Sequence, residues 1–188
     1  MEKGKMPSGD SAEFVKVAKA RVDWLDYSAP GASDESLSLH FNCWDENGDS
    51  LPGLGGVLDE GALAVLLTDS QAAEFKQLII ETAKRWIATY DFYASLPVKF
   101  TIVQVHRGDK GGRSMNVRFW REGDPIPSVL LLEYFPGYPV AHNRKRYYSD
   151  ADIVAAVRAD VNRIMDAADA LALAANRQRK ILKKERDG

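Results

Sequence analysis

The sequence has a single cysteine, no long apolar run and only a small net charge. It contains one cysteine, Cys43, which excludes a disulfide framework and a structural zinc site built on thiolates. No apolar run approaches the roughly 20 residues that a membrane-spanning helix requires. Residues 1–11 are polar and lack the apolar centre of a secretory signal. We therefore expect a soluble, cytoplasmic protein that begins with a flexible arm over residues 1–11.

The formal net charge is only −2, but the charges are unevenly distributed along the chain. Residues 1–75 carry 5 Lys and Arg against 14 Asp and Glu, a sum of −9, whereas residues 76–188 carry 20 against 13, a sum of +7. Such asymmetry is typical of a protein that meets nucleic acid, an acidic partner or another copy of itself head to tail. Charges that interleave in space would explain it equally well.

The sequence also lacks a complete metal-binding or nucleophilic motif. Residues 45–49 (DENGD) resemble the start of a calcium loop, but the sixth and twelfth places hold Ser50 and Gly56 instead of glycine and glutamate. We interpret this segment as a hairpin turn, which its Asn-Gly pair favours. His40 and Cys43 lie three residues apart on a predicted strand, so they point to opposite faces. We therefore expect Cys43 to be a buried, inert thiol.

The other candidates for a catalytic set are weaker. The glycine-rich segment 108–112 contains Lys110 but joins two predicted strands instead of opening a helix, so a phosphate-binding loop is not expected. The three histidines, His40, His106 and His142, are dispersed along the chain. We therefore predict no catalytic residue, no metal and no cofactor, and we rank an enzyme third among the possible functions.

Glu133 is the one acidic residue inside a predicted apolar strand. It follows the apolar residues 129–132 and shares a face with Leu131. A buried carboxylate needs a partner or a raised pKa. Arg118, on the neighbouring predicted strand, is the expected partner, so a structural ion pair is favoured over a catalytic role.

The first third of the chain is predicted to form strands. Residues 12–27 are ambiguous, because their apolar positions fit either a helical face or two strand segments with a register slip between them. We favour strand, because residues 37–43 alternate apolar and polar side chains and would form its partner. Residues 62–67 are a short apolar run, most simply a buried strand. Thr68 and Gln71 then form a capping box for a core helix that ends near residue 94.

Three further strands and a long helix complete the prediction. Residues 98–106, 113–120 and 128–135 are separated by glycine- and proline-containing turns and predict an antiparallel meander. We therefore expect an α+β fold, with one or more antiparallel sheets formed by the N-terminal hairpin region and the C-terminal three-strand meander. One central core helix and one long C-terminal helix complete it. Residues 12–175 would form a single domain, and residues 176–188 a basic helical tail.

The final segment, from Ser149 to about Arg186, has the pattern of one long amphipathic helix. Ser149 is placed to cap it, and Lys and Arg crowd its end, where cations favour the helix dipole. Its apolar side chains recur with alternating spacings of three and four, the period of a coiled-coil seam. We predict that a protein partner or a second copy contacts this seam, at Val161, Ile164, Ala168, Leu171, Ala175 and Leu182. The first functional hypothesis is therefore a non-enzymatic binding or assembly protein, a small subunit of a larger complex.

The second hypothesis is nucleic-acid binding. Residues 142–148 combine adjacent cations with two tyrosines, a composition that suits phosphate contacts and base stacking. The meander adds further basic and aromatic residues, which would form one stripe if they share a face. The candidate contacts are Arg107, Lys110, Arg113, Arg118, Trp120, Arg144, Lys145, Arg146 and Tyr147. A solvated loop whose tyrosines pack against the helix is the competing interpretation.

Overall fold

The computed structural model describes residues 17–31, 34–90, 97–108, 110–134, 141–142 and 151–188. Its strands form one antiparallel seven-stranded sheet in the order β3-β2-β1-β4-β5-β6-β7. The strands are β1 (Lys19–Ser28), β2 (Ser36–Trp44), β3 (Gly56–Leu58), β4 (Val98–Arg107), β5 (Arg113–Arg121), β6 (Ser128–Tyr134) and β7 (Ala141–His142). The helices are α1 (Glu60–Leu66), α2 (Asp69–Tyr90) and α3 (Ala151–Asp187). The predicted α+β fold is confirmed.

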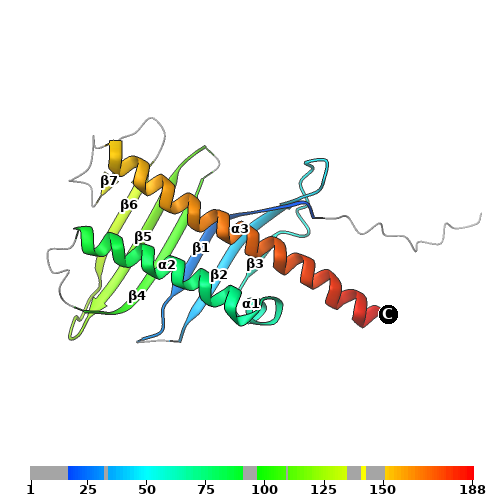
Figure 1. The fold of residues 1–188 in the computed structure, drawn as a ribbon, viewed down its shortest axis with the longest axis horizontal. Helices are drawn as coiled ribbons and strands as arrows, with labels where there is room; N and C mark the ends of the chain where they lie inside the picture. The colour runs from blue at the N-terminus through cyan, green and yellow to red at the C-terminus, as the bar shows by residue number, and fades with distance from the viewer. Residues whose placement is uncertain (1–16, 32–33, 91–96, 109, 135–140, 143–150) are drawn as a thin grey trace, which may run out of the picture.

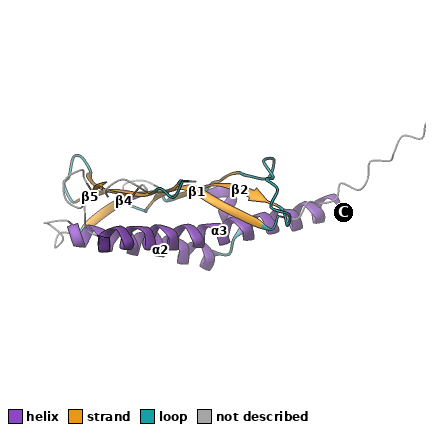
Figure 2. Ribbon diagram, turned by 90° about the horizontal axis from the view of Figure 1, so that it is seen from above, coloured by secondary structure: helices purple, strands orange, loops and turns teal. Residues whose placement is uncertain are grey.

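Helices α2 and α3 lie side by side on one face of the sheet, and α3 crosses it diagonally (Figures 1 and 2). The opposite face carries no helix within the described residues. Apolar and polar side chains alternate along β2, β4 and β5, as expected when only one face is covered. The core therefore lies between the sheet and the helices.

In the segment with ambiguous periodicity, residues 19–27 belong to strand β1, in agreement with the preference for strand, and residues 12–16 lie outside the described residues. Its register shifts between Val22 and Trp24, which marks a β-bulge. Because of the extra residue, Val22 and Leu25 both face the core although they are three positions apart, and both are fully buried. The bulge therefore explains why this strand also fits a helical period.

One predicted strand is wrong. In the run at residues 62–67, residues 62–66 belong to helix α1 and Leu67 is its C-cap, because the Asp59 side chain caps the start of the helix and accepts a 2.8 Å hydrogen bond from the backbone N–H of Ala62. The following capping box is confirmed, since the Thr68 hydroxyl accepts from the Gln71 N–H and the Gln71 side chain accepts from the Thr68 N–H. Strands β3 and β7 were not predicted. The predicted cap Ser149 lies outside the described residues.

Candidate partner-binding surfaces

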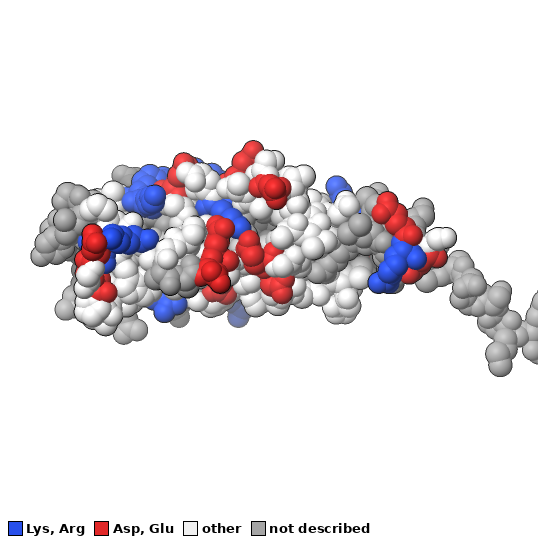
Figure 3. All heavy atoms as spheres, turned by 90° about the horizontal axis from the view of Figure 1, so that it is seen from below, with Lys and Arg blue, Asp and Glu red and all other residues white. Residues whose placement is uncertain are grey.

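The end of α3 extends beyond the body of the protein. Among the side chains that the structure describes, Ala175 and Asn176 are the last that are buried; Arg177 is exposed, and so are residues 185–188. Asn176 is tied to the core, because its amide donates to the Ala172 carbonyl at 3.1 Å and lies 3.5 Å from the Cys43 sulfur. The helix continues to Asp187, and Figures 1 and 2 show its last turns beyond the sheet. Basic and acidic side chains lie together at this free end (Figure 3).

Most of the predicted seam faces the sheet of the same chain. Val161, Ile164, Ala168 and Ala175 are completely buried in the core. Leu171 is partly buried against the core, and the side chain of Leu182 is outside the described part of the structure. These four buried side chains are therefore not accessible to a partner in this fold. Past Asn176, by contrast, Arg177 and residues 185–188 are exposed among the side chains described there.

An ion pair between the buried Arg107 and the partly buried Asp169 holds the middle of α3 against the bulge of β1. Asp169 accepts hydrogen bonds from the Val22 N–H at 2.7 Å and from the Arg107 guanidinium at 2.7 Å and 3.0 Å. The same guanidinium donates to the Val22 carbonyl at 2.9 Å. The Arg107 side chain is only 9% exposed, so its charge needs this partner. Arg107 is thus part of the structural framework.

A buried carboxylate joins α3 to α2. Asp160 accepts a 2.8 Å hydrogen bond from the Trp86 ring N–H, and it accepts from Arg85 and Arg163 at 2.9 Å and 3.2 Å. Its side chain is 8% exposed. Together with Asp169, this residue fixes the position of α3 before the helix leaves the body.

The uncovered face of the sheet is a second exposed surface. Strand pairing aligns His40, Trp24, His106, Ser114 and Glu133 in one row across five strands. The Trp24 and His106 rings meet edge to face with centroids 5.4 Å apart. Trp24 is 39% exposed, which makes this row a mixed aromatic and polar surface.

The predicted pairing of Glu133 with Arg118 is wrong. Glu133 stands opposite Ser114 on β5, whereas Arg118 stands opposite Val129. The two side chains are thus separated by four positions along the strand pair, and a sequence without the register could not show this. Glu133 is half-buried on the uncovered face.

The predicted nucleic-acid contacts lie on both sides of the sheet. Arg107 and Arg113 lie on the helix side, and the Arg113 guanidinium donates to Asn162 of α3 at 2.6 Å. Burial and the nearby cations, Arg107 first among them, lower the Arg113 pKa.

Other members of that set are more accessible. Arg118 and Trp120 alternate with the buried core residues of β5 and so lie on the uncovered face, and Lys110 is exposed in the loop after β4. Residues 144–147 lie outside the described part of the chain. The described members of the predicted set therefore do not form one stripe.

Two general findings bear on the kind of site. No described helix is both long and apolar enough to cross a membrane. Among the described residues, no group of three or more His, Cys, Asp or Glu side chains is placed to hold a metal ion.

Sequence reasoning missed the roles of Asp160 and Asp169, because polar residues that flank the apolar face of a helix carry no signal of their distant partners.

Comparison with protein-family models, with curated proteins and with solved structures gives no match, so no relative supplies a function for these surfaces.

Proposed function

We propose that this protein is a non-enzymatic binding or assembly protein, a small subunit of a larger complex that uses its C-terminal helix for protein–protein contact. The observation that carries the proposal is that α3 continues to Asp187, eleven residues past the buried Asn176, and that Arg177 and residues 185–188 are exposed among the side chains described there. Isolated helical segments of this length are marginal in water. A partner packed alongside would stabilise this one.

The charge of this segment indicates the chemistry of the partner. Residues 177–188 contain six Lys or Arg and two Asp or Glu, a sum of +4. An acidic surface would complement it and speed its association at low salt. The acidic N-terminal part of a second copy, with its sum of −9 over residues 1–75, is one such surface.

Site-specific photocrosslinking in the source cells tests the proposal. A photoreactive residue at position Arg186 is expected to give a discrete adduct, because this position is exposed beyond the last buried residue. The adduct mass distinguishes a second copy from another protein. Position Ala156, exposed on the first half of the same helix, is the matched control and is expected to give no adduct. Equal crosslinking at both positions, or none at Arg186, would contradict the proposal.

Nucleic-acid binding is a second candidate function, favoured by the position of Arg118 and Trp120 on the uncovered sheet face. Aromatic and basic side chains on an open sheet are a known platform for single-stranded nucleic acid. Fluorescence anisotropy with labelled single-stranded RNA and DNA at about 50 mM salt would measure it. Arg118→Ala is expected to reduce the salt slope by about 1, with Arg163→Ala on the helix side as control. An absence of binding by the wild-type protein would exclude this candidate.

A further inference from the structure

A cavity of about 520 Å³ lies between α2 and the sheet. It is lined by the ends of β1 and β4, by α1, and by one side of α2 that includes Lys76, Ile80 and Lys84. The volume is in the range of pockets that bind small molecules. Apolar side chains form much of its wall, including Leu37, Leu63 and Val98, which suits the apolar part of a ligand.

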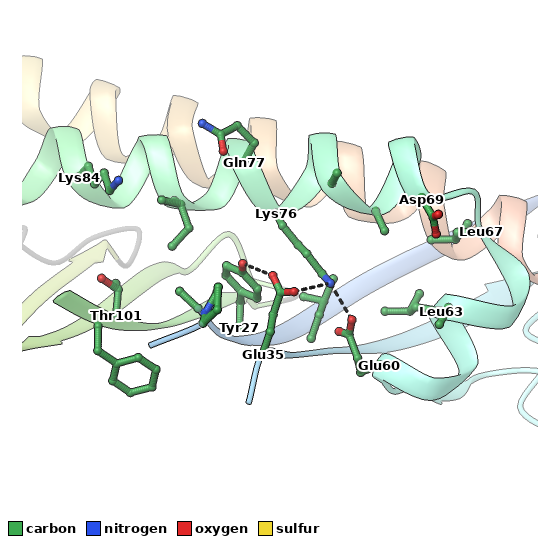
Figure 4. A pocket seen from close by; sticks show the side chains of 18 of the residues that line it. Tyr27, Glu35, Glu60, Leu63, Leu67, Asp69, Lys76, Gln77, Lys84 and Thr101 are labelled. Carbon is green, nitrogen blue, oxygen red and sulfur yellow. Dashed lines mark hydrogen bonds and ion pairs between the residues drawn. The ribbon is translucent and has the colours of Figure 1, made fainter. Parts of the chain in front are cut away.

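Four polar side chains are linked at one end of this cavity (Figure 4). The Tyr27 hydroxyl donates to Glu35 at 2.6 Å, and the Lys76 ammonium contacts Glu35 at 3.4 Å and Glu60 at 2.6 Å. The Lys76 side chain is only 14% exposed. These residues come from β1, the β1–β2 connection, α1 and α2, so the fold must be complete before they meet.

The linked groups are suited to binding and not to proton transfer. Burial, followed by the hydrogen bond to Glu35, raises the pKa of Tyr27 well above its ordinary value, so its phenol stays protonated. Burial alone would lower the Lys76 pKa, but the hydrogen bond and charge of Glu60 and the charge of Glu35 outweigh it, so the net shift is upward. Both groups therefore keep their protons at neutral pH.

This end of the cavity has an excess of negative charge. Glu35 and Glu60 together carry two negative charges against the single positive charge of Lys76. One oxygen of Glu60, Oε2, is buried and accepts no hydrogen bond, although the Lys76 ammonium lies 2.6 Å from the other oxygen. A buried carboxylate oxygen without a donor is costly. A ligand ammonium beside Glu35 and Glu60 would neutralise the excess negative charge.

The other end of the cavity has the opposite character. Lys84 lies on the same side of α2 as Lys76, about 12 Å further along the helix at 1.5 Å per residue. Figure 4 shows Lys84 and Thr101 at this end and Glu35, Glu60 and Asp69 toward the other. Among the described residues, Lys84 makes no ion pair, whereas the neighbouring Lys99 is paired with Glu122 at 2.8 Å. Acidic side chains also gather near the middle of the face seen in Figure 3.

We propose that this cavity binds a linear zwitterion, whose primary ammonium meets Glu60 and Glu35 and whose carboxylate meets Lys84. A short unbranched apolar chain between them lies along Ile80 and Leu37. The ammonium of such a ligand matches the excess negative charge of Glu35 and Glu60, and its carboxylate matches the positive charge of Lys84. A molecule with only one charged group leaves the other end of the cavity without a partner. The site is separate from the proposed partner surface, since every lining residue precedes α3.

Isothermal titration calorimetry with 6-aminohexanoate as the probe tests this proposal on the full-length protein. Hexylamine and hexanoate, which each lack one of its charged groups, are the comparison ligands. The zwitterion is expected to bind at one site and at least about tenfold more tightly than either, because each charge-assisted contact is worth about that factor.

Two variants locate the charged groups. Lys84→Gln is expected to lower the affinity for 6-aminohexanoate to that for hexylamine and to leave hexylamine binding unchanged. Glu60→Gln is expected to weaken both amines and to leave hexanoate binding unchanged. Glu74→Gln is the matched control, since Glu74 is exposed on α2, the helix that carries Lys84, and does not line the cavity.

Several results would overturn the proposal. These are an absence of saturable binding, equal affinities for the three ligands, and an unchanged preference in Lys84→Gln, whose side chain is exposed and whose loss leaves the fold intact. Removal of residues 177–188 is expected to leave 6-aminohexanoate binding unchanged. The zwitterion site and the proposed assembly function can therefore fail independently.

Discussion

At the scale of single residues, a charged side chain becomes structural when it pairs with a polar group that is far away in the sequence and close in the fold. Cys43 was predicted to be a buried thiol from strand alternation alone, and it is 1% exposed. The linked groups Tyr27, Glu35, Glu60 and Lys76 were not predicted, because they are far apart in the sequence and none belongs to a recognisable motif. Local patterns report which face a side chain occupies, and they do not report what stands opposite.

Tyr27 gives a prediction for alkaline pH. Its folded-state pKa is raised above the ordinary value of 10.0, so the folded protein retains a proton that the unfolded chain has lost above that pH. The resulting stabilisation is complete below pH 10.0 and is lost as the pH rises further. Lys76, raised from 10.5, acts in the same direction.

Tyr27→Phe removes one of these two titrations. We expect the melting temperature of the variant to fall less than that of the wild-type protein between about pH 8 and about pH 11, as followed by circular dichroism. The variant is also expected to be less stable at neutral pH, because Glu35 loses a hydrogen-bond donor. Parallel alkaline losses in the two proteins would show that Tyr27 keeps its ordinary pKa when the protein is folded.

At the scale of elements, the periodicity of apolar residues identified most strands and both long helices. It failed where the same spacing fits both a helix and a strand. The bulge in β1 gave apolar residues three positions apart, which also fits a helix. The six residues 62–67 are too few to show any period, and α1 is decided by the Asp59 cap.

The buried face of α3 is wider than the seam of a coiled coil. Its heptad-like positions are only the centre of a wider buried face, because Met165 and Ala172 beside them are also fully buried. A stripe of this width is typical of a helix packed on a globular core, whereas a coiled coil uses a narrower seam. The spacing of three and four residues therefore marks a buried face, and at Val161, Ile164, Ala168 and Ala175 this face packs in the core of the same chain.

The buried ion pair predicts how strongly α3 is fixed to the sheet. Asp169→Ala is expected to lower the free energy of unfolding by about 3 kcal/mol, because it removes the two short hydrogen bonds between the buried Arg107 guanidinium and a carboxylate. Urea denaturation measures this change. Asp166→Ala on the same helix is the control, since its side chain is 76% exposed and 3.7 Å from Arg107, and a change within about 0.5 kcal/mol is expected. Similar losses in both variants would contradict a special role for Asp169.

At the scale of the whole molecule, the one-sided architecture leaves two features uncovered by other described residues, the open sheet face and the end of α3. The asymmetry of charge along the chain, visible in the sequence, agrees with an intermolecular role for the basic end. The length of the helix was predictable from its uninterrupted pattern. The residue at which the helix leaves the body could not be predicted from the sequence, because it depends on where the sheet beneath the helix ends.

The most direct test of the assembly proposal is the native size of the protein in extracts of its source cells, compared between the full-length chain and a chain that ends at Asn176. The cut is placed after Asn176 because this residue is buried and hydrogen-bonded to the core. We expect the full-length protein to migrate in a complex larger than its 20.9 kDa chain. The shortened chain is expected to migrate as a monomer with an unchanged unfolding free energy. A full-length protein that migrates as a monomer, or a shortened chain that remains in the complex, would contradict the proposal.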